Sequence, residues 1–379
     1  MKFQSEQLLD YPYDLYENWR QNHPIWQDEE TGMWVLSRHD DVRAVLKNSE
    51  HYSSSAMGEG GNPLPLLSDD PPRHTQLRGL VNKAFTVRML RRIESSVESI
   101  AQDLVAEIEP GKSIDIVKAL TTPLPVAVIS DMMGIPIDKG EDFKRWSDAL
   151  TGTLAGASIT DRESEIMDMG AYFASLIPDR RENPGNDLVS AVVNAEIDRE
   201  RLTDADIVGF NILLLIAGNE TTTNLLGNFL NIIVDRPDLL QRLLQDPGLI
   251  EGAIEETLRF DGPVQFLRRR LLKPAVFYGH KIKVGEVVQV VMGSANRDER
   301  NYQDADQFVM DRARNHHHTF GFGIHFCIGA PLARLEAKIA IKALLGRFRS
   351  LQRGHTENER VPSHLLRGFH HLYMTLAES

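Results

Sequence analysis

Cys327, the only cysteine in the chain, lies in the segment "HTFGFGIHFCIGAPLAR", residues 318–334, in which glycines occupy positions 321, 323 and 329. Glycine permits backbone conformations closed to other residues, so the loop can curl around the sulfur and turn amide N–H groups toward it. The helix that Pro331 begins adds a partial positive charge, which stabilises a thiolate and lowers the thiol pKa. The segment therefore predicts a reactive thiolate.

Such a thiolate could act as a nucleophile, a zinc ligand or an axial ligand of haem iron. Structural zinc sites need several Cys or His ligands at short spacings, and here one cysteine is accompanied only by the run His316–His318, which keeps metal binding open. A cysteine hydrolase would need a histidine base that folding brings to the sulfur, which the sequence does not show.

The segment "FGFGIHFCIGAPLAR" resembles the haem-ligand signature of the cytochrome P-450 superfamily, F-G-x-G-x-H-x-C-x-G-x-x-L-A-R, at every fixed position. The resemblance implies that Cys327 is the proximal thiolate ligand of the iron of haem b. It also implies that Phe320 packs against the ligand loop, that His325 hydrogen-bonds a haem propionate, and that Gly329 borders the cofactor.

Two other segments are expected to bind the haem propionates, which need cationic partners once buried. In "DDPPRHTQLRGLVNKAF", His74 and Arg78 are four residues apart and share one helical face. This spacing resembles the H-x-x-x-R segment of the same family, whose side chains bind propionates. Arg269, flanked by Arg268 and Arg270, resembles the family's other propionate-binding arginine.

The segment "EETLR" places Glu256 and Arg259 on one helical turn, where spacing alone would indicate an ordinary surface ion pair. It resembles the superfamily's E-x-x-R motif, a buried structural pair behind the haem. Arg312 in "FVMDRARNHH" lies where a third member of that network is expected. We assign all three residues to structure, with no part in the chemistry.

A long helix is expected at 204–235, and its centre, "IAGNETTT", breaks the apolar pattern. Glycine and an ionised glutamate are both costly inside a buried helix. The Thr221 hydroxyl can bond back to the Ala217 carbonyl, which would loosen the helix and open a groove; a plain kinked core helix is the alternative. The segment resembles the family's [AG]-G-x-[DE]-T-T motif, which implies that Glu220 and Thr221 deliver protons and that Ala217 lies above the iron.

Helical periodicity dominates the rest of the chain, so the expected class is mainly α with small β-sheets. The resemblance implies the cytochrome P-450 fold, a triangular helical prism with haem between the long central helix and the Cys-ligand helix, and one domain over 1–379. Residues 24–48 read as strand, turn and strand followed by a helix, and "HKIKVGEVVQVVMG" reads as a hairpin around Gly285. The other expected helices cover 81–108, 139–150, 163–177, 237–245, 249–260 and 331–348.

The composition restricts the class of partner. A net charge of -12 argues against nucleic acid and anionic lipid, which both need a positive field. One cysteine excludes an intrachain disulfide, and we find neither a signal peptide nor an apolar run long enough to span a membrane. We expect a soluble, cytoplasmic protein.

The resemblance implies a haem-thiolate monooxygenase that inserts one oxygen atom of O2 into a C–H bond of a lipophilic molecule: a fatty acid, terpenoid, steroid or macrolide precursor. Electrons are expected from NAD(P)H through a ferredoxin or flavodoxin and its reductase, with the enzyme a monomer. The partner is expected to dock on a basic patch of Lys83, Arg88, Arg91, Arg92, Arg334 and Lys338. The substrate pocket is expected to be lined by the 53–68 loop and by Leu213, Ile216, Ala217, Val264, Phe266, Leu267 and Phe369.

Three alternative functions remain. A peroxide-driven peroxygenase would share the thiolate, although the specialised fatty-acid peroxygenases replace the acid–alcohol pair that Glu220 and Thr221 would form. A non-enzymatic haem sensor or electron carrier would not need that pair at all. A cysteine hydrolase would bind no haem.

Overall fold

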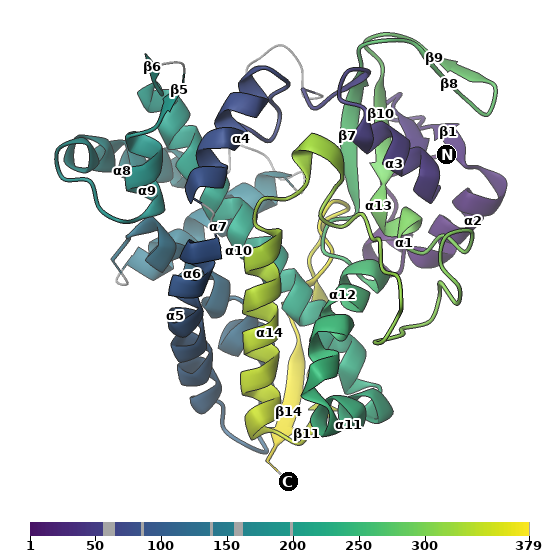
Figure 1. The fold of residues 1–379 in the computed structure, drawn as a ribbon. Coiled ribbons are helices and arrows are strands. Elements are labelled where there is room, and N and C mark those ends of the chain that lie inside the picture. The colour runs from purple at the N-terminus through teal and green to yellow at the C-terminus, as the bar shows by residue number, and fades with distance from the viewer. Residues whose placement is uncertain (56–64, 85–86, 137–138, 155–161, 198–199, 379) are drawn as a thin grey trace.

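The computed structural model describes residues 1–378 except 56–64, 85–86, 137–138, 155–161 and 198–199. Helices dominate it (Figure 1). They are α1 (Glu6–Asp10), α2 (Tyr13–Asn22), α3 (His39–Lys47), α4 (Arg73–Ala84), α5 (Val87–Ala106), α6 (Pro123–Met133), α7 (Gly140–Leu154), α8 (Glu163–Glu182), α9 (Leu188–Val193), α10 (Asp204–Val234), α11 (Pro237–Gln245), α12 (Ile250–Phe260), α13 (Met292–Ala295) and α14 (Ala330–Arg347).

The strands form small sheets. The largest has the order β1-β2-β10-β7-β3, and a second has the order β11-β14-β4. The bounds are β1 (Ile25–Gln27), β2 (Trp34–Leu36), β3 (Tyr52–Ser53), β4 (Ser113–Asp115), β5 (Glu196–Ile197), β6 (Glu200–Arg201), β7 (Phe266–Leu271), β8 (Ala275–Phe277), β9 (His280–Ile282), β10 (Val287–Val291), β11 (Ser350–Arg353), β12 (Glu359–Arg360), β13 (Phe369–His371) and β14 (Tyr373–Ala377). The prediction of a mainly helical protein with small sheets is confirmed.

Two of the predicted elements are wrong in detail. The expected hairpin around Gly285 does not form, because β9 pairs with β8 while β10 pairs with β7 and runs parallel to β2. Gly285 does turn the chain, with a φ of 87° that favours glycine. The expected helix over 81–108 is two helices, α4 and α5, and the first of them begins at Arg73.

Helix α10 runs through the centre of the molecule and is apolar on most of its surface, as a helix packed on all sides must be. Its few polar side chains hold it to its neighbours. Asn219 donates to the Ser147 hydroxyl of α7 at 2.8 Å, and Asn228 donates to the backbone carbonyls of Asp261 and Arg367. In Figure 1, α14 lies in front of α10 and beside α5. These contacts fix α10 opposite the start of α14.

No helix among the described residues is both long and apolar enough to cross a bilayer.

Candidate functional site

A large cavity lies between α10 and the cysteine loop that leads into α14. Its empty space amounts to about 1400 Å³, the opening to solvent included. Many of the residues predicted from the sequence meet on its wall: Arg78, Leu213, Ala217, Thr221, Val264, Leu267, Phe320, His325, Cys327 and Gly329. The fold therefore brings together segments that are up to about 250 residues apart in the chain.

The cysteine loop is held by backbone contacts. The amide of Cys327 donates to the Phe320 carbonyl at 2.8 Å. Gly323 has a φ of 75°, and a Cβ there would lie 2.7 Å from the Leu46 carbonyl oxygen, so only glycine fits. Close packing of this loop against α3 therefore depends on a residue without a side chain.

The sulfur of Cys327 accepts backbone N–H groups from Gly329 and Ala330, as the glycine pattern predicts. Even so, burial raises the pKa of the Cys327 thiol, because desolvation of the thiolate outweighs those donors and the nearby Arg78. The expectation of a lowered pKa is therefore wrong for the thiol by itself. A coordinated metal ion deprotonates a thiol outright, so the loop is suited to a ligand rather than to a free nucleophile.

Four basic side chains gather at one edge of the cavity. The rings of His74 and His325 lie 4.1 Å apart between centroids, and both nitrogens of His74 and Nε2 of His325 are buried without a hydrogen-bond partner. Arg269 is buried and donates to the backbone carbonyl of Arg268 at 2.8 Å. Among the described residues, neither Arg78 nor Arg269 forms an ion pair; the nearby Asp70 is bound to Ser53 and Ser54.

The charge state of this cluster follows from its burial. Desolvation lowers the pKa of His325 to about 3 and that of Arg269 to about 10. The cluster thus offers two guanidinium cations and two neutral imidazoles to an acceptor that the protein itself does not supply. Haem b carries two propionates, and charge-assisted hydrogen bonds to carboxylates are what such a set makes best. Together with Cys327, these residues fit a haem.

The centre of α10 approaches the same cavity. Thr221 lines it and donates from Oγ1 to the Ala217 carbonyl at 2.8 Å, the back-bond expected from the sequence. The helix nevertheless continues unbroken from Asp204 to Val234. Glu220 is half-buried beside the cavity wall, and its Oε1 accepts from Asn224 Nδ2 at 3.3 Å. Of the predicted acid–alcohol pair, only Thr221 therefore lines the cavity; Glu220 precedes it on α10 and is not one of the lining residues.

Three predicted substrate residues lie elsewhere. Phe266 points to the opposite face of β7, where its ring packs edge-on against Phe3, and its neighbour Leu267 lines the cavity because side chains alternate along a strand. Ile216 lies in the main hydrophobic core. Phe369 packs against α10 at Gly227. Of the predicted 53–68 loop, residues 56–64 lie outside the described part, and Leu66 and Leu67 line the cavity.

The E-x-x-R residues form a buried network behind the cysteine loop. Arg259 binds Glu256 through two nitrogens at 2.7 and 2.8 Å, and both side chains are inaccessible to solvent. Arg312 Nε reaches Glu256 at 3.1 Å, and the remaining Arg259 donors reach the backbone carbonyls of Asn296, Ala305 and Gln307. The network joins α12 to the chain that precedes the cysteine loop, so its geometry is that of a structural support.

Glu336 is a cavity residue that sequence reasoning missed. It is buried, lines the cavity two turns along α14, and its Oε2 has no hydrogen-bond partner. Burial raises the pKa of this carboxyl to about 8, so it is mostly protonated at neutral pH. The sequence "ARLEAK" gives no signal for this, because the same letters suit an exposed helical face.

Glu336 should make the stability depend on pH. Its pKa lies above the ordinary value of 4.5, so the folded state binds the extra proton and loses stability as pH rises from about 4.5 to 8. Replacing Glu336 by glutamine should remove that loss. Between pH 6 and pH 8, the gain in unfolding free energy of Glu336→Gln over the parent should grow by about 2 kcal/mol. Urea unfolding of the haem-loaded protein measures this difference.

Glu50→Gln is the control, because it removes the same charge from an exposed position. Equal pH profiles for all three proteins would contradict the raised pKa of Glu336.

The predicted docking patch is weaker than the sequence suggests. Arg334 pairs with Glu255 and Lys338 with Glu251, both on α12, so two of its cations are neutralised. Arg92 donates to the Asn186 carbonyl at 2.9 Å. The side chains of Lys83 and Arg88 lie outside the described part.

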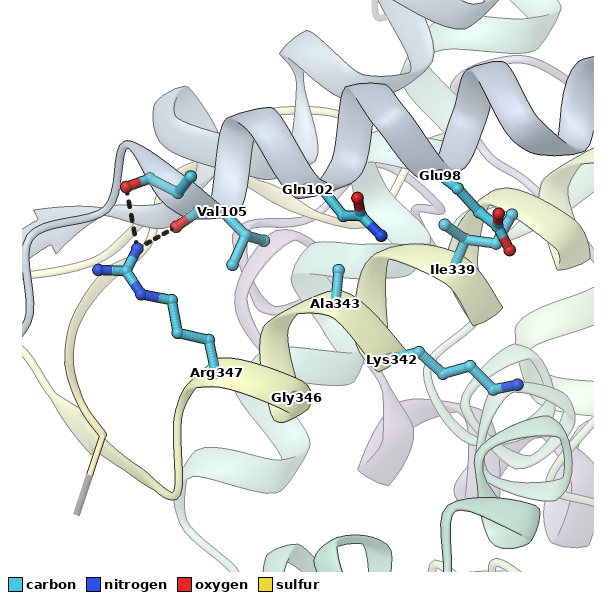
Figure 2. A pocket seen from close by; sticks show the side chains of 9 residues that line it. Glu98, Gln102, Val105, Ile339, Lys342, Ala343, Gly346 and Arg347 are labelled. Atoms are coloured by element: carbon cyan, nitrogen blue, oxygen red, sulfur yellow. Dashed lines mark hydrogen bonds between the residues drawn. The ribbon is translucent and has the colours of Figure 1, made fainter.

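A second hollow, between α5 and α14, does not have the features of a catalytic site (Figure 2). It is an open groove whose wall carries isolated charges, such as Glu98 and Lys342. Arg347 at one end donates to the Val105 and Ala106 carbonyls at 2.6 and 3.0 Å. Chemistry is therefore better placed in the cavity beside Cys327.

Comparison with known proteins agrees with this geometry. The family model described as Cytochrome P450 matches residues 5–161 and 159–368. The chain is 38% identical to the putative cytochrome P450 YjiB of Bacillus subtilis (strain 168) over 89% of this chain and 87% of that protein. It superposes on CYP109E1 from Bacillus megaterium in complex with testosterone with a TM-score of 0.87 and 38% identity, covering 96% of this chain and 99% of that one.

A mutant of P450 EryK in complex with erythromycin B gives a TM-score of 0.90 at 32% identity, with 98% of each chain covered. The fold is thus the cytochrome P450 fold, whose members are haem b monooxygenases. The cavity, its cysteine and these matches together show that the chain belongs to the cytochrome P450 family.

Proposed function

We propose that this protein is a haem-thiolate monooxygenase that hydroxylates a lipophilic small molecule with one oxygen atom of O2. One observation carries the proposal: a single cavity joins the Cys327 loop, the unpaired basic cluster and the hydroxyl of Thr221. The rest of its wall is largely apolar, which suits a lipophilic substrate. Two related proteins hold molecules of that kind, testosterone and erythromycin B.

The residues of this chain would divide the work. Cys327 would bind the iron through its thiolate, and His74, Arg78, Arg269 and His325 would hold the propionates. When bound, the haem supplies the activation of O2 for insertion into a C–H bond. Thr221 Oγ1 would hold a proton in the cavity. After that proton is consumed, Glu220, the preceding residue of α10, would supply the next one. The apolar wall would exclude water from the substrate.

The proposed reaction consumes two electrons for each oxygen atom inserted. We propose NAD(P)H with a ferredoxin or flavodoxin and its reductase as the source, and the described chain as one catalytic domain. The ion pairs of Arg334 and Lys338 argue for a docking surface that uses fewer cations than the predicted patch.

Thr221→Ala tests the proton role. The variant should keep the haem spectrum of the parent, yet its product formed per NAD(P)H consumed should fall roughly tenfold, with hydrogen peroxide appearing instead, because the proton at Oγ1 is lost. Product, peroxide and NAD(P)H are measured in one reaction with ferredoxin and reductase. Thr221→Ser keeps the hydroxyl and should restore coupling. Unchanged coupling in Thr221→Ala would remove this residue from the mechanism.

The same assay separates the alternatives. A peroxygenase would give its full rate with hydrogen peroxide and no redox partner, and a haem sensor or electron carrier would form no product under either condition. The presence of Glu220 and Thr221 at adjacent positions of the sequence favours the O2-dependent reaction, since neither alternative needs both groups.

A further inference from the structure

The hairpin formed by β8 and β9 projects from the body of the molecule beyond β7 and β10 (Figure 1). Its turn is Tyr278–Gly279, and both residues have a positive φ, 50° and 83°, as a type I′ turn requires. One face of the hairpin is anchored. Ile282 is buried in a core that includes residues of α3 and β10, and Ala275 and Phe277 pack against that core. The hairpin is therefore a fixed projection of the fold.

The tip of the hairpin is tied to the body as well. The Tyr278 hydroxyl donates to Asp41 of α3 at 2.6 Å, and its ring centre lies 5.1 Å from the guanidinium carbon of Arg38. The ring of His280 lies 5.5 Å from that of Trp34 in β2. These contacts set the direction in which the outer face of the hairpin points.

The hairpin and its base expose an unusual share of apolar side chains. Of the ten exposed large apolar side chains among the described residues, four are Leu272, Val276, Tyr278 and Val284. Val276 is 64% exposed and Val284 59% exposed. Single apolar side chains on a surface are ordinary, but several gathered on one projecting element indicate a surface that binds something.

The same segment is basic. Lys273, Lys281 and Lys283 are exposed, and Lys281 is paired in register with Val276 across the hairpin. None of these three lysines forms an ion pair within the described chain, whereas Lys2, Lys112, Lys139 and Lys338 each pair with a carboxylate. Residues 272–285 contain no Asp or Glu. The hairpin thus combines exposed aliphatic groups with three uncompensated positive charges.

We propose that this hairpin docks the protein on an anionic lipid surface. Val276 and Val284 enter the headgroup region, and the lysines bind the negative groups of the lipids. Aliphatic side chains among lysines suit a membrane surface, which rewards both apolar burial and positive charge. Protein interfaces instead favour aromatic residues and arginine and are depleted in lysine. The chemistry of this surface therefore favours lipid over an acidic protein.

The net charge of -12 opposes attraction of the whole chain to anionic lipid. At physiological salt, however, exposed charges more than about 8 Å apart are largely screened from each other, so the charges of the hairpin dominate once it touches the surface. The two neighbouring acids are engaged by the hairpin itself: Asp41 accepts from the Tyr278 hydroxyl, and Glu286 accepts from the Lys283 amide. Docking would hold the protein where lipophilic molecules accumulate.

Binding of the haem-loaded protein to sedimented vesicles tests the proposal. We expect the parent to bind vesicles of phosphatidylcholine with about one third phosphatidylserine at least tenfold more tightly than vesicles of phosphatidylcholine alone. The double variant Lys281→Glu/Lys283→Glu should lose this preference. Val276→Ser should weaken binding to the phosphatidylserine vesicles about tenfold, because an aliphatic side chain no longer enters the surface. None of these measurements depends on hydroxylation, so the proposed function and this inference can fail separately.

Two variants are matched controls. Lys118→Glu/Lys342→Glu makes the same change of charge at exposed lysines of other elements, and Met167→Ser removes an apolar side chain of α8 that is 66% exposed. If either control loses as much binding as its hairpin counterpart, the effect is not local and the inference is wrong. Equal binding of the parent to both kinds of vesicle, or to neither, would also overturn it. If the parent ignores vesicles but Lys281→Glu/Lys283→Glu slows reduction by ferredoxin, the hairpin docks a protein instead.

Discussion

Replacing Cys327 by serine should remove the strongly red-shifted Soret band that the parent gives with carbon monoxide after reduction, and should lower hydroxylation by at least a hundredfold. The chain has no second cysteine that could replace the thiolate. The N–H groups of Gly329 and Ala330, which face the sulfur, would then face a neutral alcohol. Thiolate ligation is what favours O–O cleavage in these enzymes, so activity should be lost together with the band.

A neighbouring change provides the control for this experiment. Phe326 precedes the cysteine and is 40% exposed, so Phe326→Leu should leave the position of the carbon monoxide band unchanged. A red-shifted band in Cys327→Ser would show that the iron takes its ligand from another residue. A parent protein without haem would favour the cysteine hydrolase.

Glu256→Ala should lower the unfolding free energy of the haem-loaded protein by about 3–5 kcal/mol. The substitution leaves Arg259 with no carboxylate in a site that is inaccessible to solvent, and it deprives Arg312 of the same partner. Most of the variant is expected to be recovered without haem, because the network supports the chain that leads into the cysteine loop. Urea unfolding and the haem content per chain measure the two effects.

Glu251→Ala is the matched control for Glu256. Glu251 lies on the same helix, α12, and pairs with Lys338 at the surface, where an ion pair contributes less than about 1 kcal/mol. If the two variants lost similar amounts of unfolding free energy, the buried network would contribute no more to stability than the surface ion pair of the same helix.

Local patterns predicted the elements well and their pairing poorly. The turn near Gly32 and the strands on either side of it form as expected, because an adjacent hairpin is decided by neighbouring residues. The segment around Gly285 looks equally like a hairpin, yet β10 pairs with β7 and β2 instead. Alternating side chains show that Val287–Val291 is a strand, but they do not specify which distant strand it joins.

The sequence predicted those residues of the site that belong to motifs. The cysteine loop, His74 with Arg78, and Thr221 have fixed spacings, and the structure places all of them around one cavity. Phe266 was predicted to line the cavity and does not, because successive side chains of a strand point to opposite faces of the sheet. Glu336 could not be found at all, since α14 packs against α5, α10 and α12, and no local pattern encodes which of its side chains this packing buries.

Because of the four basic side chains at the edge of the cavity, the amount of folded enzyme should depend on the supply of its cofactor. Before haem binds, the folded chain buries Arg269 and His74 although no carboxylate is bound to either side chain. A ligand that binds only the folded state shifts the equilibrium toward it in proportion to its concentration. In a cell short of haem, newly made chains would spend longer in forms that chaperones and proteases recognise. The abundance of this enzyme should therefore follow the cell's haem supply, even at constant transcription.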